Sequence, residues 1–218
     1  VILIGDENEG YTYAHIKGIR EALANVGLTE ANVIFKYTVG EDEKCYDAAC
    51  DLVDQKCQLI ISNSYGHQSH MQRAASENPN VTFIAMTGDS AASSGLANFK
   101  NAFTGIYQAR YVPGVVAGLK LKEMMAADSS VQPHIGYVGA FPFAEVKSGY
   151  TAFLLGIQSI VPQAYMDVQF TNSWFSITDE AAAAEALIAR GCVIIGQHAD
   201  STGAPQACEA ARKNGKNV

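Results

Sequence analysis

The sequence lacks the features that would place it in a membrane or among nucleic-acid binders. No apolar run approaches the ~20 residues that a membrane-spanning helix needs, and no basic run occurs among the scattered Lys and Arg residues. The formal net charge is −7 and the pI is about 5.2. Because nucleic-acid binding requires basic groups that displace counterions, we expect no nucleic-acid partner.

The beginning of the chain also lacks a leader pattern. Residues 1–5 read as a strand, with no charged segment followed by an apolar one, so we expect no signal peptide within the chain. Either the protein is cytoplasmic or the chain begins after a processed leader, and composition alone does not decide between them.

Motifs for catalysis and phosphate binding are missing as well. There is no G-x-S-x-G elbow, no Walker motif and no Rossmann glycine fingerprint, and the carboxylates are dispersed rather than paired. His67 and His70 lie three residues apart with no nearby carboxylate, which is a weak pattern for a metal. A hydrolytic triad can be drawn only from scattered residues: Ser64, His67, Asp89, His198 and Asp200. We therefore predict no catalytic residue, no metal ligand and no cofactor.

The chain has five cysteines, an odd number. Their spacing matches neither a zinc site nor a C-x-x-C redox pair, so we interpret them as small buried apolar residues. A disulfide between Cys192 and Cys208 stays open, because spacing cannot establish one.

What the sequence does have is a repeated alternation of short β-rich runs and helix-periodic stretches. Its 218 residues are 48% hydrophobic, which is enough for two lobes. The runs at 59–61 and 193–195 are apolar throughout, as in parallel strands covered on both faces. Strands are predicted near 1–5, 32–37, 58–62, 81–86, 101–104, 134–138, 165–170 and 193–196. Helices are predicted near 12–26, 43–55, 69–77, 107–126, 144–160, 179–190 and 203–214. This order predicts an α/β fold with parallel sheets flanked by helices.

The best internal boundary lies near Gly105 to Tyr107, which predicts an N-terminal lobe over 1–106 and a second lobe over 107–218. The long helix that follows contains Gly114 and Gly118. Glycine lowers helix propensity, so this pair predicts close packing against a neighbouring element.

Ligands of open α/β sheets bind beyond the carboxyl ends of the strands, and the unusual residues of this chain follow the predicted strands. They are Asp6–Tyr11, Asn63–His67, Thr87–Asp89, Gly139–Phe143, Asn172–Phe175 and Gln197–Ser201. Aromatic side chains mixed with amides and carboxylates suit a flat heterocycle with donors and acceptors. The alternative is that Phe141, Phe143 and Phe175 cap the lobe cores. This pattern favours binding over catalysis.

The same segments carry a resemblance to a known family. They are Gly10–His15, Ser62–Gly66, Ala109–Gly118, Gly136–Val146, Asn172–Phe175 and Gln197–Ser201. Each is weak alone, but together and in this order they make the chain similar to the basic membrane lipoprotein (Bmp) family of ABC-transporter substrate-binding proteins, the purine nucleoside receptor-like group. Tyr11 stands where relatives tend to have Trp.

The resemblance implies a type I periplasmic-binding-protein fold of two Rossmann-like lobes, which hold a purine nucleobase or nucleoside in the cleft between them. It also implies a monomer outside the cytoplasm, in the periplasm or on the outer face of the membrane, usually lipid-anchored, that delivers its ligand to a membrane permease. Carried over by position, Tyr11 and Trp174 form a stacking pair, with polar partners at Asn8, Tyr65, Gln197 and Asp200; the full predicted site adds Gly66 and Phe141. Relatives return to the first lobe after the second, so we expect the first lobe to lack its returning segment and the second lobe to be incomplete at its C-terminal end.

Two rival functions stay open at this point. A nucleoside-hydrolysing enzyme on the same scaffold would need a metal-binding Asp cluster, and only Asp6 is offered at the first strand end. The ligand-sensing domain of a regulator shares this fold and would need a helix-turn-helix before residue 1.

A final expectation concerns Trp174 and Asp200, which follow consecutive predicted strands. If these strands are neighbours, their loops emerge about 5 Å apart, and an indole and a carboxylate meet at the ligand. The alternative is that Trp174 folds back on its own lobe and Asp200 caps the helix that begins near Gly203.

Overall fold

A computed structural model describes residues 1–218, which divide into two units, Val1–Thr104 and Gly105–Val218. The division falls just before the long helix α5 (Ile106–Ala127), two residues ahead of the lobe boundary drawn from the sequence. Each unit is an α/β layer structure with its own parallel sheet. We describe the two units separately.

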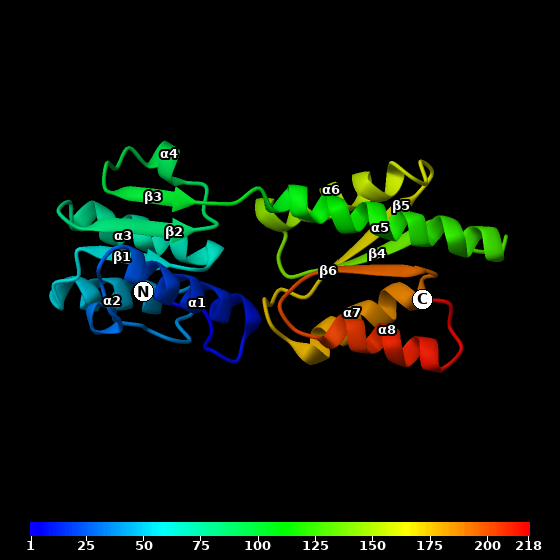
Figure 1. The fold of residues 1–218 in the computed structure, drawn as a ribbon, viewed down its shortest axis with the longest axis horizontal. Helices are drawn as coiled ribbons and strands as arrows, with labels where there is room; N and C mark the ends of the chain where they lie inside the picture. The colour runs from blue at the N-terminus through cyan, green and yellow to red at the C-terminus, as the bar shows by residue number, and fades with distance from the viewer. The chain divides into compact units, whose positions relative to one another are not determined.

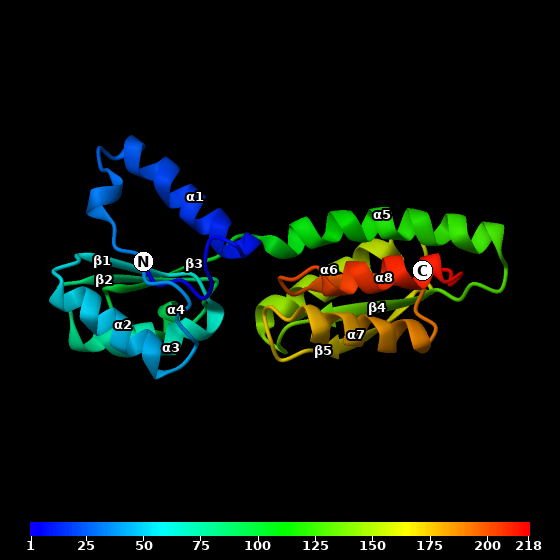
Figure 2. The same cartoon turned by 90° about the horizontal axis from the view of Figure 1, so that it is seen from below.

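Unit 1 contains a three-stranded parallel sheet in the order β1-β2-β3. The strands are β1 (Leu59–Ser62), β2 (Thr82–Met86) and β3 (Phe99–Ala102). The helices are α1 (Gly10–Asn25), α2 (Glu43–Asp54), α3 (Gln68–Glu77) and the short α4 (Ala91–Ser94), with 3₁₀ turns at Glu30–Asn32 and Tyr65–His67. Helices α2 and α3 lie on one face of the sheet and α1 on the other (Figure 2).

Two of the predicted strands are shorter than expected. The runs at 1–5 and 32–37 form only isolated parallel bridges, from Ile2 to Lys36 and from Ile2 to Ser62. The Ile2 amide donates to the Ile61 carbonyl at 2.7 Å, and the Leu3 amide donates to the Lys36 carbonyl at 2.8 Å. The N-terminal segment therefore lies between the two others, but the ladder ends where the chain turns at Gly5.

The core of unit 1 forms on the face of the sheet that α2 and α3 cover. Its fully buried members include Ile2, Leu52, Ile60, Met71 and Phe83. Helix α2 begins where the Asp42 side chain accepts a hydrogen bond from the Lys44 amide at 2.9 Å. This cap satisfies one of the amides that a helix start leaves unpaired, and it fixes where the chain leaves the preceding loop.

Unit 2 contains a three-stranded parallel sheet in the order β5-β4-β6. The strands are β4 (His134–Gly139), β5 (Tyr165–Phe170) and β6 (Ile194–His198), and the helices after α5 are α6 (Ala144–Gln158), α7 (Ile177–Ala189) and α8 (Gly203–Lys213). Helices α5 and α6 lie on one face of the sheet and α7 and α8 on the other (Figure 1). Strand β4 is buried at every position, because it is central and covered on both faces.

Helices α5 and α6 approach each other through glycines. A Cβ on Gly114 would lie 2.2 Å from the Phe153 carbonyl oxygen, and a Cβ on Gly156 would lie 2.4 Å from the Tyr111 carbonyl oxygen. Gly118 is similarly tight against Ile157. The close packing predicted for Gly114 and Gly118 is therefore confirmed.

All the predicted helices form, and the predicted parallel arrangement of the strands is confirmed. None of the helices combines the length and apolarity that a membrane crossing requires. All five cysteines are free thiols in this structure, Cys192 and Cys208 included. Cys45 and Cys192 are buried and the others are partly buried.

Candidate functional site

In unit 1 the loops that follow the strands are held together by polar side chains. Tyr65 donates its hydroxyl to Asp89 Oδ2 at 3.1 Å, and Gln68 donates its amide to Asp89 Oδ1 at 3.3 Å. The Gln68 carbonyl oxygen in turn accepts from the amides of Asp89 and Ser90, at 2.9 and 3.1 Å. The loop after β1 and the loop after β2 are thereby fixed to each other, with Asp89 exposed at the surface.

Glu41 is a residue of this network that the sequence prediction missed. Its Oε1 accepts hydrogen bonds from the Ser64 hydroxyl and from the Gly66 amide, the latter at 2.9 Å. A Cβ on Gly66 would lie 2.4 Å from the Glu41 carboxyl carbon, so residue 66 must be small for the carboxylate to reach its amide. Glu41 follows the predicted strand at 32–37. The expectation that binding residues lie just beyond the carboxyl ends of strands would therefore have found it.

The predicted residues Tyr11 and Asn8 come from the loop and helix start after the first strand segment. Tyr11 donates its hydroxyl to the Asn63 carbonyl, and its ring meets His15 edge-on with centroids 4.6 Å apart. The backbone amide of Asn8 donates to Asp6 Oδ1 at 2.8 Å in an exposed turn. Helix α1 is capped by Glu9, whose carboxylate accepts from the amides of Tyr11 and Thr12. This cap fixes the start of the helix that carries Tyr11.

His67 supports these loops from beneath. It is fully buried, and its Nε2 lies 3.0 Å from the Val39 carbonyl oxygen. Burial lowers the pKa of His67, because desolvation penalises the charged ring, while its bond to Val39 and nearby Glu41 oppose the shift. A neutral imidazole that donates from Nε2 fits the contact with Val39, so His67 supports the loop.

In unit 2 the corresponding loops meet through aromatic rings. Phe141 stacks on Phe143 with centroids 4.9 Å apart and an interplanar angle of 11°. Trp174 lies against both rings, at 5.4 Å from Phe141 and 6.2 Å from Phe143. We refer to these three side chains as the aromatic cluster. Each is only partly buried, whereas Phe175 is 51% exposed; Phe175 therefore does not cap the core.

Strands β5 and β6 are not neighbours, contrary to the expectation for Trp174 and Asp200. Strand β4 lies between them, so their loops are two strand spacings apart where they leave the sheet. The loops nevertheless converge, because the Asp200 amide donates to the Trp174 carbonyl at 2.7 Å. The predicted proximity holds at the backbone for a different reason from the one first given.

The alternative role of Asp200 as a helix cap does not hold. Helix α8 has Thr202 at its N-cap without a side-chain bond, and the Gly203 amide donates to the Ser201 hydroxyl at 3.1 Å. The alternative for Trp174 fits in part, since its ring packs on Phe141 and Phe143 of its own unit.

Two polar side chains fix the loop that carries Asp200. The Gln197 amide nitrogen donates to the carbonyls of Ala199 and Ser201, both at 2.7 Å. Glu180, which is fully buried, accepts from the amides of Ser176 and Ser201, each at 3.2 Å. Glu180 thus ties the loop after β5 to the loop after β6. Glu180 lies in the first turn of α7. An acidic residue there is common because it interacts favourably with the helix dipole, so the sequence offers no reason to assign it a special role.

Unit 2 also contains a buried pair of ionisable groups, His198 and Glu145. His198 Nε2 is 3.7 Å from Glu145 Oε1, and the two side chains are 7% and 11% exposed. A Cβ on Gly149 would lie 2.7 Å from His198 Nδ1, so this glycine makes room for the ring. The pair occupies the carboxyl end of β6 and the first turn of α6, and it supports the loops from within unit 2.

The structure thus gathers seven of the eight predicted residues into two groups, one in each unit, while Asn8 bonds only to Asp6 in its own turn. Phe141, Trp174, Gln197 and Asp200 belong to one connected set at the carboxyl end of the unit 2 sheet. Tyr65 and Gly66 belong to another set in unit 1, with Tyr11 joined to it through Asn63. Aromatic rings together with amide and carboxylate groups, as in the unit 2 set, can recognise a flat polar heterocycle.

Solved structures identify the class of this architecture as the type I periplasmic-binding-protein fold. A solute-binding protein from Aeropyrum pernix K1 has a TM-score of 0.82 at 15% identity, covering 98% of this chain and 58% of that chain. An ABC transporter solute-binding protein from Conexibacter woesei DSM 14684 has a TM-score of 0.65 at 21% identity, covering 96% and 66%. A transcriptional activator from Bacillus halodurans is similar too, with a TM-score of 0.66 at 19% identity and coverage of 99% and 68%. At these identities the likeness shows the fold alone.

The family is shown by sequence. The family model described as Bmp, ABC transporter substrate-binding protein PnrA-like, matches residues 5–218. The chain belongs to this family, which is one of binding proteins and not of enzymes.

Two curated relatives are similar over much of the chain. A purine-binding protein from Brucella abortus is 33% identical over 206 residues, covering 94% of this chain and 55% of the relative. A putative ABC transporter glucose-binding protein from Haloferax volcanii is 33% identical over 153 residues, covering 70% and 36%. The chain therefore spans about half the length of the first relative and less of the second.

Proposed function

We propose that this chain is the ligand-recognising part of an extracytoplasmic receptor that delivers a purine nucleobase or nucleoside to the permease of an ABC importer. Family membership supports the receptor role. The relative named as purine-binding, which is similar over 94% of the chain, supports the ligand class. The observation that carries the proposal is the aromatic cluster, joined to the Asp200 loop by the Asp200–Trp174 backbone bond.

The aromatic cluster suits a purine because the ligand ring can extend an existing stack. Phe141 and Phe143 are parallel, and Trp174 is tilted against them by 57° and 47°, so the indole is held from one side by packing. A side chain already fixed in place loses little conformational entropy when it binds a ligand. Stacking on such a ring requires only the flat face of a base, whatever its substituents. The cluster would therefore accommodate both a free base and a nucleoside.

Polar recognition is assigned to the residues around the rings. Asp200 offers a carboxylate that can accept from ring N–H, amino or ribose hydroxyl groups. Tyr65 and Asn8 are proposed as further polar contacts, with Gly66 leaving space beside them, and Tyr11 as the second stacking ring. The side-chain nitrogen of Gln197 donates to two backbone carbonyls, so we propose that Gln197 acts by holding the conformation of the Asp200 loop.

The setting of the receptor follows from the same proposal. Substrate-binding proteins of ABC importers act outside the cytoplasm, and we propose that location here, with a lipid anchor in the full-length protein and a monomeric state. Light scattering on the purified protein tests the monomer, and fractionation of cells that express the full-length protein tests the location.

Calorimetric titration tests the ligand class. We expect binding of adenine, guanine, hypoxanthine or their nucleosides, and no binding of the matching nucleoside monophosphates, because the candidate loops offer no glycine-rich phosphate cradle. Glucose is included because one relative is named for it. Native mass spectrometry of the freshly purified protein shows in addition which ligand is retained.

The outcomes separate the alternatives. If glucose binds and no purine does, the proposed ligand class is wrong and the receptor role still holds. Release of free base from guanosine, adenosine or inosine, abolished in Asp200→Asn, would overturn the receptor reading in favour of an enzyme.

A further inference from the structure

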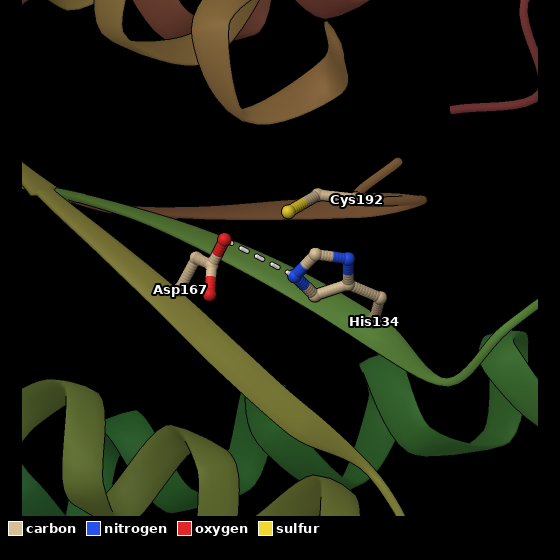
Figure 3. Close-up of side chains that lie close together, drawn as sticks. All are labelled: His134, Asp167 and Cys192. Carbon is tan, nitrogen blue, oxygen red and sulfur yellow. Dashed lines mark ion pairs between the residues drawn. The ribbon is translucent and has the colours of Figure 1, made fainter. Parts of the chain in front are cut away.

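A second cluster of polar side chains lies in unit 2, away from the carboxyl ends of its strands. His134 is the first residue of β4, Asp167 lies on β5, and Cys192 precedes β6 by two residues. Figure 3 shows the three side chains converging from these three segments. We propose that the His134–Asp167–Cys192 cluster is a binding site for a zinc-like transition-metal ion, a role that goes beyond the proposed ligand-binding function.

The distances between the candidate ligand atoms carry this proposal. His134 Nε2 lies 3.3 Å from Asp167 Oδ2, and one ligand atom from each of the three residues lies within 4.8 Å of the others. Two ligands of one tetrahedral zinc, each at ~2.0–2.3 Å from the metal, are about 3.3–3.6 Å apart. The His–Asp pair already has this separation. The sulfur needs a movement of about 1 Å at most, which a side-chain torsion supplies.

The His134 ring is held in place with its nitrogen turned to the cluster. It stacks on Tyr165 with centroids 4.4 Å apart and an interplanar angle of 20°. The residue is 9% exposed, and Nε2 is buried without a hydrogen bond of good geometry. A buried ring nitrogen without a well-aligned hydrogen bond costs free energy, and a metal ion at this point would remove that cost.

Sheet geometry explains why residues so distant in the sequence meet here. His134 pairs with Tyr165 in the parallel register, and Gly136 pairs with Asp167, so His134 and Asp167 point to the same face of the sheet. Gly136 provides the space next to them, since a Cβ there would lie 3.2 Å from the Cβ of Cys192. The cysteine can therefore approach the same face from the segment before β6.

The donor set selects the kind of metal. An imidazole nitrogen, a thiolate and a carboxylate suit Zn²⁺ and its neighbours in the first transition row, whereas Mg²⁺ and Ca²⁺ prefer oxygen ligands alone. The Asp167 side chain is 36% exposed, so water can supply the fourth ligand. Three protein ligands and an open position are typical of accessible zinc sites.

One cation borders the cluster. Arg190 Nη1 lies 3.7 Å from Asp167 Oδ2, and Nη2 donates to the Gln169 side chain at 3.3 Å. The Arg190 side chain is 45% exposed, so it can turn to solvent when a metal ion takes its place beside the carboxylate. Burial raises the pKa of the Cys192 thiol to about 11, with Asp167 adding to the shift. Metal binding then breaks the S–H bond, and the proton passes to solvent as the S–metal bond forms.

Titration of the reduced protein with Zn²⁺, and with Co²⁺ as a coloured probe, tests the site. We expect one equivalent to bind, with a thiolate-to-cobalt absorption in the near ultraviolet. Removing a ligand by Cys192→Ser or His134→Ala should weaken binding by at least about 100-fold and should abolish the thiolate absorption in the first variant. Cys208→Ser and His70→Ala keep the cysteine and histidine counts matched and should bind like the parent protein.

Asp167→Asn is a second variant that we expect to fold normally, because the Asp167 side chain is partly exposed. Circular dichroism should be unchanged in it, and zinc affinity should fall. The proposal is overturned if the parent protein binds no zinc, or if binding and the cobalt spectrum survive both His134→Ala and Cys192→Ser. Neither result depends on a purine, so the metal site and the ligand-binding function can fail independently.

Discussion

The two units differ in how the loops at the carboxyl ends of their parallel strands are held together. In unit 1 the loops are joined by side-chain hydrogen bonds, with Glu41, Gln68 and Asp89 at the centres. In unit 2 the surface at this end of the sheet is a stack of rings, and one buried carboxylate, Glu180, joins the loops below it. Hydrogen bonds constrain the donor and acceptor directions, whereas ring packing buries apolar area in stacked or edge-on arrangements. At the carboxyl ends of its strands, unit 1 therefore presents hydrogen-bonding groups, and unit 2 presents aromatic rings.

The strongest test of this comparison is Glu180→Ala. The substitution leaves the partly buried amide of Ser176 and the buried amide of Ser201 without their acceptor, and each unsatisfied buried group costs about 1–3 kcal/mol. We expect the free energy of unfolding to fall by roughly 2–4 kcal/mol. Hydrogen exchange should rise over 171–176 and 199–202 and stay unchanged in unit 1. The exposed Glu185→Ala, on the same helix, is the matched control and should be near neutral.

Trp174→Ala tests whether the aromatic cluster holds the ligand. Loss of a stacking ring should weaken purine binding by ~1–3 kcal/mol, measured by calorimetry. Phe175→Ala removes the adjacent ring, which is 51% exposed, and should leave affinity unchanged. Equal losses in the two variants would show that the loop as a whole matters and the indole does not.

Gly66→Ala tests the polar side of the comparison. The added Cβ would force the Glu41 carboxylate away from the Gly66 amide, and crowding of this kind costs about 1–3 kcal/mol. Gly18→Ala is the contrasting control, because nothing lies within 4 Å of a Cβ there and alanine raises helix propensity by up to about 1 kcal/mol. Chemical denaturation should therefore show opposite signs for the two substitutions.

The smallest expected effect is the pH dependence contributed by His67. Burial lowers its pKa below the ordinary value of 6.5, so below that pH the unfolded chain binds a proton that the folded chain does not. Stability should consequently decline as the pH falls from about 7 towards the folded pKa of His67. His67→Gln keeps a donor for Val39 and should flatten this part of the urea-unfolding profile. His70→Gln, which removes the neighbouring partly exposed ring, should leave the decline in place.

Much of the fold was predictable because apolar runs and helix periodicity are local signals. The strands at 59–62 and 165–170 and the helices after them follow from such patterns. The strand at 1–5 was predicted too long, since its length depends on partners at Lys36 and Ser62 and on the turn at Gly5. The order β5-β4-β6 was also missed, because strand order is set by crossovers that leave no local signature.

The candidate site was predictable only where a residue follows a strand. That rule found Phe141, Trp174 and Asp200, whose contacts within unit 2 are now visible. It could not find Glu180, which lies within an apolar helix and acts through two distant amides. His134, Asp167 and Cys192 are further apart than any spacing motif covers, and only the register of the sheet brings them together.

The position of Ile2 between two later segments has a consequence for how this chain folds. The backbone nitrogen of Val1 lies within hydrogen-bond distance of the Ile34 carbonyl, 33 residues on, and the Ile4 backbone amide donates to the Asn63 side chain, 59 residues on. During synthesis residues 1–4 are made before their partners, and their apolar side chains stay unpaired until residues 59–63 have been made. Contacts that close such long loops form slowly, so the first segment is the place where a nascent unit 1 is most exposed to aggregation.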